Sequence, residues 1–372
     1  MKFFLLLGWL VGFAHAQIQV GAILPLSGAL ASVGEVQEAA LRASAEALEA
    51  RGVVLEITLR DSRSRPDRAA ARVQELLDSG VHILVCCETP EVGARVTPLA
   101  AAAGLSTLTL APSTAADVTW LFALAPEETA PLERLSLETP LHPFGLMAPV
   151  GRAGDLAAER LQPKVGAARY PVARPPLTPE ALQIATREPA SVVVWDNGEG
   201  TVRATEALSA RGYGGAVIVR ADIWDDLNAL ERAKLTGARS VLSPAVLGYT
   251  LSDAHPSKAA VSSFRRALIV VPDGALTGAA LAAGAGAWDA AQLIGSAAEQ
   301  VLAYNVVTDT EAGREAVRGA LRDALVTLGP VTGAGGTYDF TEGDFSDGSS
   351  SGLQPDSLVL AEWRSGRFRP LP

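Results

Sequence analysis

Cysteine and histidine are scarce in this chain of 372 residues, which contains two cysteines and four histidines. The cysteines, Cys86 and Cys87, are adjacent, so no disulfide framework connects distant segments and stability must come from apolar packing. Adjacent cysteines lack the two-residue spacing of thioredoxin-like and zinc sites. We interpret them as small buried residues at a strand end. Because the histidines are scattered, we expect no metal site.

Positive charge is also in short supply, since 31 Lys and Arg residues stand against 41 Asp and Glu, for a net charge of −10. The basic residues form no stripe that would neutralise phosphates, so nucleic acid is not an expected partner. No Walker loop occurs, and no G-x-G-x-x-G follows a predicted strand. We therefore expect neither a nucleotide nor any other cofactor.

One segment matches the sequence pattern of a catalytic motif but lacks the structural context that the motif requires. Residues 348–352 read Gly-Ser-Ser-Ser-Gly, the pattern of a nucleophile elbow. That motif needs a strand-to-helix turn, whereas this segment lies in a loop rich in glycine, serine and aspartate. No histidine follows to complete the order Ser, Asp, His. We predict that the protein is not an enzyme.

The first 16 residues have the composition of a secretory signal peptide. One positive charge, Lys2, precedes a short apolar run, and small residues flank a predicted cleavage point after Ala16. An apolar run of about a dozen residues is too short to cross a bilayer core of ~30 Å. An uncleaved membrane anchor is the alternative. Gln17, rather than cysteine, follows the cleavage point, so no lipid anchor is indicated and a periplasmic or extracellular protein is expected.

Short strands alternate with helices along the first third of the mature chain. The spacing of apolar residues changes from a period of two to a helical period and back, with glycine or proline at the boundaries. Such alternation through short loops predicts a parallel, doubly wound sheet. The predicted strands are 18–24, 53–59, 81–85 and 105–110, and the predicted helices are 34–51, 67–79 and 91–103.

A comparable series begins again after the proline-rich stretch 126–143, so the chain predicts two lobes of similar architecture. Three helices follow the second series, and the C-terminal segment is predicted to contain turns and strands that cap one of the lobes. The second series has predicted strands 144–150, 191–195, 216–220 and 238–242, helices starting near Asp155, Pro179, Thr201 and Asp225, and then helices 256–268, 277–304 and 310–328.

The order of several short motifs resembles the leucine/isoleucine/valine-binding family of type I periplasmic binding proteins, the substrate-binding proteins of ABC transporters. No single motif is specific, but together they cover nearly the whole mature chain in the expected order. They are Val20 to Gly28, Arg60-Asp61 before Pro66, the run 76–84, Ala111-Pro112-Ser113-Thr114, Ala287-Trp288-Asp289-Ala290, and Tyr338-Asp339-Phe340 near Gly343-Asp344.

This resemblance implies two α/β lobes joined by three crossovers, with a small molecule bound in the cleft between them. We expect lobe 1 to comprise 17–128 plus 250–330, and lobe 2 to comprise 129–249 plus 331–372. The crevice beyond the carboxyl ends of the strands is where open α/β sheets bind ligands. The resemblance further implies an ABC transporter permease in the inner membrane as the protein partner.

In the first lobe, the family's carboxylate-binding turns correspond to Cys87-Glu88-Thr89-Pro90 and to the turn at Ser113 and Thr114. Thr89, Ser113 and Thr114 are therefore expected to bind the ligand, although a hydroxyl at such a position can instead cap its own helix. Glu88 departs from the family pattern. An acid here would repel a carboxylate and suit a cationic or neutral ligand, unless the side chain points to solvent.

In the second lobe, Asp222 corresponds to the acid that the family places against a ligand ammonium group, or it caps the helix expected near Asp225. The turn at Trp195 and Asp196 also follows a strand, where an aromatic ring can stack on the ligand or pack in the core. Arg152 stands where the family has an aromatic residue and would suit an anionic group.

The sequence thus predicts an extracytoplasmic solute-binding protein for an amino acid, branched-chain or other, or for an amide. The alternative is a sensor of amide or urea type with the same fold, which signals through a separate partner.

Overall fold

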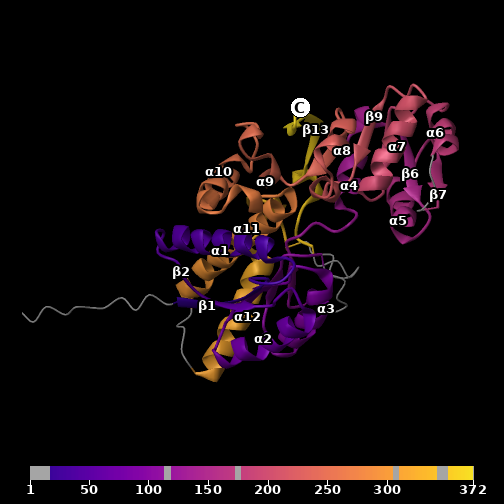
Figure 1. Ribbon diagram of the computed structural model, residues 1–372. Coiled ribbons are helices and arrows are strands. Elements are labelled where there is room, and N and C mark those ends of the chain that lie inside the picture. Colours follow the sequence, from indigo (N-terminus) through magenta and orange to yellow (C-terminus); the bar gives the residue numbers. More distant parts are fainter. Residues whose placement is uncertain (1–16, 113–118, 172–176, 305–309, 342–350, 372) are drawn as a thin grey trace, which may run out of the picture.

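The computed structural model describes residues 17–112, 119–171, 177–304, 310–341 and 351–371. In this part of the chain, two large β-sheets lie in separate lobes, each flanked by helices (Figure 1). The chain passes from the first sheet to the second after strand β5, returns after β10, and crosses again after helix α12. None of the described helices combines the length and the apolar character needed to span a bilayer.

The first sheet is entirely parallel, in the order β2-β1-β3-β4-β5. Its central strand β3 alternates its side chains between two apolar layers, one formed with α1, α11 and α12 and the other with α2 and α3. The strands are β1 (Gln17–Leu24), β2 (Val54–Asp61), β3 (Ile83–Cys86), β4 (Thr107–Thr109) and β5 (Leu121–Ala123), and the helices are α1 (Ala31–Glu49), α2 (Pro66–Asp78), α3 (Pro90–Ala102), α11 (Gly278–Tyr304) and α12 (Glu311–Thr327).

The second sheet has the order β14-β13-β10-β9-β8-β6-β7, with β13 and β14 antiparallel to their neighbours and the other strands parallel. Its strands are β6 (Phe144–Pro149), β7 (Ala167–Tyr170), β8 (Ser191–Val194), β9 (Ala216–Val219), β10 (Arg239–Leu242), β13 (Val359–Arg364) and β14 (Arg367–Pro370), and its helices are α4 (Ala130–Ser136), α5 (Arg152–Leu161), α6 (Thr178–Ala185), α7 (Gly198–Ala210) and α8 (Ala229–Lys234).

Smaller elements connect the two lobes. Helices α9 and α10 follow β10, and a two-stranded sheet of β11 and β12 follows α12. Their bounds are α9 (Pro244–Leu247), α10 (Lys258–Ala267), β11 (Val331–Thr332) and β12 (Thr337–Tyr338), and the 3₁₀ turns are η1 (Thr139–Leu141), η2 (Asp222–Asp225), η3 (Gly248–Thr250), η4 (Leu268–Val270), η5 (Asp273–Ala275) and η6 (Pro355–Ser357).

The helix expected to start near Asp225 is present as α8, but it starts later than predicted. Residues 222–225 form the 3₁₀ turn η2, and α8 begins at Ala229 with Asn228 as its N-cap in a reciprocal capping box with Glu231. The Asp225 carboxylate instead accepts hydrogen bonds from the first two amides of α11. Several residues near Asp225 could serve as an N-cap, and only their hydrogen bonds show which one does. The partners of Asp225 lie more than 50 residues away, so the local sequence does not predict them.

Two strands, β5 and β7, were not predicted, because each has only three or four residues and neither stands out as a long apolar run. The C-terminal segment adds β13 and β14 to the second sheet. The fold class is confirmed as α/β with two lobes built on parallel sheets. The residue boundaries of the lobes stay a prediction.

Candidate functional site

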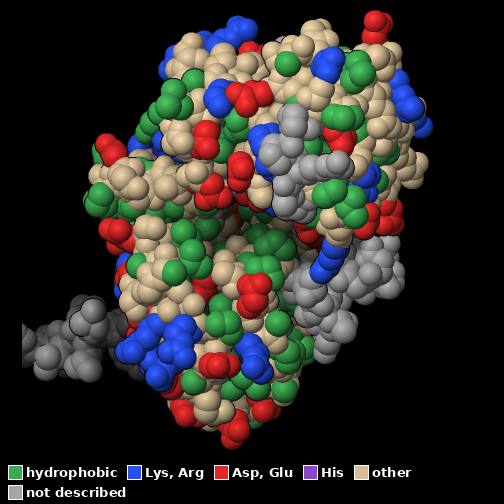
Figure 2. Space-filling model, turned by 45° about the vertical axis from the view of Figure 1, so that its right-hand side comes forward, with side chains coloured by type: hydrophobic (Ala, Val, Ile, Leu, Met, Phe, Trp, Pro, Cys, Tyr) green, Lys and Arg blue, Asp and Glu red, His purple; other side chains and the backbone are tan. Residues whose placement is uncertain are grey.

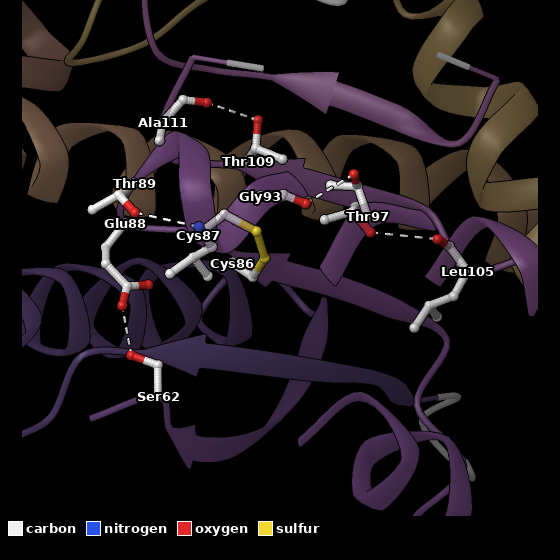
Figure 3. The surroundings of a disulfide bond; sticks show 12 residues. Ser62, Cys86, Cys87, Glu88, Thr89, Gly93, Thr97, Leu105, Thr109 and Ala111 are labelled. Carbon is white, nitrogen blue, oxygen red and sulfur yellow. Dashed lines mark hydrogen bonds between the residues drawn. A yellow bond between two sulfur atoms is a disulfide. The ribbon is translucent and has the colours of Figure 1, made fainter. Parts of the chain in front are cut away.

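Thr89 is the N-cap of α3 and follows the carboxyl end of β3. Its hydroxyl oxygen accepts a hydrogen bond from the Val92 amide at 3.3 Å, and the side chain is half-buried (Figure 3). The hydroxyl thus accepts a hydrogen bond from an amide in the first turn of α3, as an N-cap residue does, and the capping interpretation explains its position. Its predicted contact with a ligand stays a prediction.

The second predicted turn begins in the described part of the chain. Thr109 donates its hydroxyl to the Ala111 carbonyl at 3.1 Å, which fixes the exit from β4. Ser113 and Thr114 lie outside the described residues, as do the predicted signal peptide, residues 1–16, and residues 348–350 of the elbow-like motif. The predictions on these residues are unchanged.

Glu88 points away from the Ala111 turn and toward Ser62, at the end of β2 (Figure 3). The Ser62 hydroxyl donates to Glu88 Oε1 at 2.6 Å, while Oε2 is buried without a hydrogen-bond partner among the described residues. Burial raises the pKa of Glu88, against the opposing effect of the Ser62 hydrogen bond. Glu88 is therefore neither a solvent-facing side chain nor a neighbour of the second turn.

Cys86 and Cys87 are bonded to each other as a vicinal disulfide at the end of β3 (Figure 3). Both are fully buried, as the sequence predicted, but the bond between them was missed. Cys87 has a positive φ of 78° and directly precedes the Glu88-Thr89 turn. The adjacency of two cysteines in a chain predicted to be exported was the signal that could have revealed the bond.

An ion pair between Arg220 and Asp222 lies at the end of β9, and of the two residues only Asp222 was predicted from the sequence. Arg220 donates to both oxygens of Asp222, from Nε at 2.9 Å and from Nη2 at 2.5 Å. The Arg220 guanidinium also lies 5.2 Å from the ring centre of the buried Trp195 and 3.8 Å from Glu128. Hydrogen bonding to Asp222 is the main cause of the raised pKa of Arg220.

Asp222 is thus the acid of a bidentate pair with a cation stacked on Trp195. Sequence reasoning selected Asp222 and Trp195 and missed Arg220, which links them. An Arg two residues before an Asp carried no distinctive signal, because the pairing depends on the bend after β9. The structure brings these three side chains together in the second lobe.

Asp196 is buried and has its partners within the second lobe. It accepts hydrogen bonds from the Tyr170 hydroxyl at 3.0 Å and from the Asn197 amide at 2.8 Å, at the start of α7. Burial and the neighbouring Asp196 raise the pKa of Tyr170. Arg152, by contrast, is exposed at the first turn of α5.

A cavity of about 430 Å³ lies where the two lobes meet. Its walls come from the residues that follow β4, β5, β9 and β10, from the first turns of α11, and from β13 and β14. Asp222 is the one predicted site residue, among those the structure describes, that lines it. Figure 2 shows the molecule hollowed between its upper and lower parts, with hydrophobic side chains in the hollow and acidic ones along its upper edge.

A second carboxylate joins the lobes at this cavity. Asp225, in η2, accepts hydrogen bonds from the amides of Gly278 at 3.0 Å and Ala279 at 2.7 Å. These are N-terminal amides of the 27-residue α11, which packs against α1 in the first lobe. A carboxylate at a helix N-terminus is favourable for the unpaired amides and the helix dipole.

Two α/β lobes with loops at the carboxyl ends of their strands, and a cavity at their junction, are the architecture of a protein that encloses a small molecule between lobes. The comparisons with known proteins agree with this class. The family model described as "Periplasmic binding protein" matches residues 17–134. No curated protein matches the chain.

Solved structures match over almost the whole chain. A putative branched-chain amino acid ABC transporter protein from Rhodospirillum rubrum is 18% identical with a TM-score of 0.70, covering 95% of this chain and 100% of that one. An extracellular ligand-binding receptor from Rhodopseudomonas palustris HaA2 is 17% identical with a TM-score of 0.65, covering 96% and 100%. An ABC transporter substrate-binding protein from Desulfitobacterium hafniense, in complex with Leu, is 18% identical with a TM-score of 0.65, covering 95% and 100%.

The protein therefore has the fold of the type I periplasmic binding proteins, and the resemblance seen in the sequence is confirmed at that level. The matched family is one of binding proteins, in agreement with the prediction that the chain is not an enzyme.

Proposed function

We propose that the protein is the extracytoplasmic solute-binding protein of an ABC transporter and binds a small polar solute between its lobes. The observation that carries this proposal is the Arg220–Asp222 pair beside the junction cavity. The pair offers both a carboxylate and a guanidinium to a ligand at a place where the two lobes approach each other. Charge-assisted hydrogen bonds of this kind contribute about 1.5–3 kcal/mol each.

The ligand class we propose is an amino acid, branched-chain or other, or an amide. Asp222 would accept the ammonium or amide donors, and Thr89, Ser113 and Thr114 of the first lobe would contact the other end of the ligand. Trp195 and Asp196 would border the site from the second lobe. The relative from Desulfitobacterium hafniense, solved with Leu, supports this ligand class.

Binding would select a closed arrangement of the lobes, which the permease recognises and reopens. The three passages of the chain between the lobes are the natural hinges. The proposed location is the periplasm or the extracellular space, reached through cleavage after Ala16. N-terminal sequencing of the protein recovered from expressing cells tests this, and a first residue other than Gln17 would overturn the cleavage point.

A thermal-shift screen of residues 17–372, unfolded and refolded to strip bound ligand, tests the function. The panel should contain amino acids, amides, urea, polyamines, nucleosides and sugars. A ligand at about 100 times its dissociation constant adds about 2.7 kcal/mol of stability. X-ray scattering with the ligand so identified should then give a smaller radius of gyration. An unchanged radius at saturation would contradict lobe closure.

A sensor of amide or urea type is the second candidate, and the first-lobe turn favours it. The Thr89 hydroxyl is already engaged as an N-cap, which suits a carboxylate ligand poorly. Deleting the gene separates the two functions. Loss of uptake of the radiolabelled ligand indicates transport, whereas normal uptake with loss of ligand-dependent gene expression indicates sensing.

A further inference from the structure

The disulfide between Cys86 and Cys87 joins a residue within the first sheet to the first residue beyond it. Cys86 ends β3, where it pairs in register with Ile23 of β1 and Thr109 of β4. Its carbonyl also accepts a hydrogen bond from the Leu110 amide at 2.8 Å. The bond therefore anchors the start of the turn between β3 and α3 to the central strand of the sheet (Figure 3).

Cys87 has a backbone conformation that favours glycine. Its φ of 78° lies in the left-handed region, which residues with a side chain adopt uncommonly. Five other non-glycine residues in the described part of the chain have a positive φ, and all five are exposed or half-buried, whereas Cys87 is fully buried. The bond to Cys86 holds this conformation, because two adjacent residues whose side chains are linked cannot rotate independently.

A bond between adjacent residues contributes little to the stability of the whole fold. A disulfide stabilises a protein mainly by restricting the unfolded chain, and this effect grows with the number of residues that the bond encloses. The bond between Cys86 and Cys87 encloses no intervening residue. Its effect is therefore confined to the conformation of the turn that follows.

Two contacts depend on the conformation of this turn. Glu88 accepts a hydrogen bond from the Ser62 hydroxyl at 2.6 Å, which ties the turn to the end of β2. Thr89 caps α3 by accepting a hydrogen bond from the Val92 amide at 3.3 Å. A rotation of Cys87 to a negative φ redirects the chain immediately before Glu88 and Thr89. Both contacts are therefore coupled to the disulfide.

The first turn of α3 packs on the disulfide. Both cysteine side chains lie in the apolar layer formed with α2 and α3, and Val92 belongs to the same layer. A Cβ added at Gly93 would lie 3.9 Å from the Cβ of Cys87. The Thr89 cap thus secures the helical turn that shields the disulfide, while the disulfide positions the cap. Loss of either contact loosens the other.

We propose that Cys86 and Cys87 form a redox switch that sets the conformation of the Glu88-Thr89 turn and thereby controls ligand binding. The reductant is an external dithiol. One of its thiolates attacks a sulfur of the disulfide, and the other cysteine leaves as a thiolate that takes up a proton. The second thiol of the dithiol then attacks the mixed disulfide and frees the second cysteine. The protein gains two electrons and two protons, and the dithiol becomes a disulfide.

Reduction allows Cys87 to adopt a negative φ, so Glu88 leaves Ser62 and the Thr89 cap is lost. Reoxidation restores both contacts. Disulfides persist outside the cytoplasm, so the oxidised form is the resting state expected of an exported protein. The switch goes beyond the proposed function, and its effect on ligand binding rests on that function through Thr89.

Thiol counting and hydrogen exchange of the purified protein test the switch. Because the chain has only two cysteines, a denatured sample should show no free thiol before treatment with dithiothreitol and two after it. Amide exchange in a peptide covering residues 89–93 should be at least tenfold faster in the reduced protein and should slow again after oxidation with oxidised glutathione. Exchange in α1 should not change. Two free thiols in the untreated protein, a disulfide that survives dithiothreitol, or equal exchange in the two forms would overturn the proposal.

Two variants separate the bond from the reductant. Cys86→Ala removes the bond and should exchange at residues 89–93 as fast as the reduced wild type, with or without dithiothreitol. Cys87→Gly also removes the bond, but glycine adopts a positive φ readily, so its exchange should be slower than that of Cys86→Ala. Exchange in Cys86→Ala as slow as in the oxidised wild type would show that the turn does not need the bond, contrary to the proposal.

Calorimetric titration with leucine, a probe of the proposed amino-acid class, measures the consequence for binding. The oxidised protein should bind leucine at least tenfold more tightly than the reduced protein. Equal affinities of the two forms would overturn the control of binding by the switch. Failure of the proposed function gives a different result, with no leucine binding in either form while the exchange difference remains, and that result supports the switch of the turn alone.

Discussion

The Tyr338 hydroxyl donates a hydrogen bond to the buried carboxyl group of Asp289 at 3.0 Å. The two residues belong to motifs nearly 50 positions apart that both resemble the type I periplasmic binding family, and this contact brings the two motifs together. The amides of Ala334 and Gly335 donate to the same carboxyl group at 2.7 Å. Asp289 therefore fastens the β11–β12 connection to α11.

Asp289 should make stability depend on pH. Burial, only partly opposed by its three hydrogen bonds, raises the pKa of Asp289 from 3.8 to about 7. The folded state then holds a proton that the unfolded chain releases, so this contribution to stability is full below about pH 4 and is lost as the pH rises through about 7. Urea unfolding of wild type and Asp289→Asn from pH 4 to 8 should show a stability difference that changes across this window.

Tyr338→Phe gives the matched control for that measurement. It removes one hydrogen bond that lowers the pKa of Asp289, so the loss of stability should move to higher pH, with an overall cost of about 1 kcal/mol. A difference between wild type and Asp289→Asn that stays constant from pH 4 to 8 would show that Asp289 does not titrate there.

Two helix glycines should respond oppositely to replacement by alanine. A Cβ at Gly34, in α1, would lie 2.2 Å from the Pro25 carbonyl oxygen, so the turn after β1 must shift at a cost of about 1–3 kcal/mol. Gly319, in α12, has nothing within 4 Å, and alanine there should stabilise by roughly 0.5–1 kcal/mol. Urea unfolding of both variants measures this, and equal effects would contradict the close approach at Pro25.

Most of the fold could be predicted because the apolar pattern and the helix boundaries are local. The proline at the start of α3 and the glycine after α1 mark their helix ends in the sequence itself. What could not be predicted depends on distant partners. The place of β13 in the second sheet is decided by its pairing with β10. The 3₁₀ turn η2, whose Asp225 accepts hydrogen bonds from α11, precedes the expected helix and delays its start to Ala229.

Only those site residues that directly follow a predicted strand could be selected from the sequence. Asp222 and Trp195 could be selected from their positions after β9 and β8, but Arg220 joins them through a bend that no local pattern encodes. The cluster of aromatic rings that lines the cavity could not be predicted for the same reason. Trp224 and Phe368 are far apart in sequence, and their rings meet only after β14 joins the second sheet.

Removing the Asp225 carboxylate should loosen the junction between the lobes. Asp225→Ala leaves the amides of Gly278 and Ala279 without their acceptor, at a cost of about 1 kcal/mol, as for other N-terminal caps. Asp273→Ala removes an exposed acid near the same helix and serves as the control for charge alone. Urea unfolding and X-ray scattering should show lower stability and a wider distribution of lobe separations for Asp225→Ala only. Identical results for both variants would mean that the contact does not hold the lobes.

Asp222→Ala should weaken the binding of an amino-acid ligand at least tenfold, about 1.4 kcal/mol, because the ammonium group loses its carboxylate. The same change leaves Arg220 with only the more distant Glu128 as an ion-pair partner among the described residues, so its positive charge adds repulsion toward a cation. A neutral amide carries no such charge, so its affinity should fall less than that of the amino acid. Calorimetric titration of both ligands compares the two losses, with the exposed Asp226→Ala as the control. An amino-acid affinity that is unchanged in Asp222→Ala would remove this residue from the binding site and leave Arg220 as the group that meets the ligand.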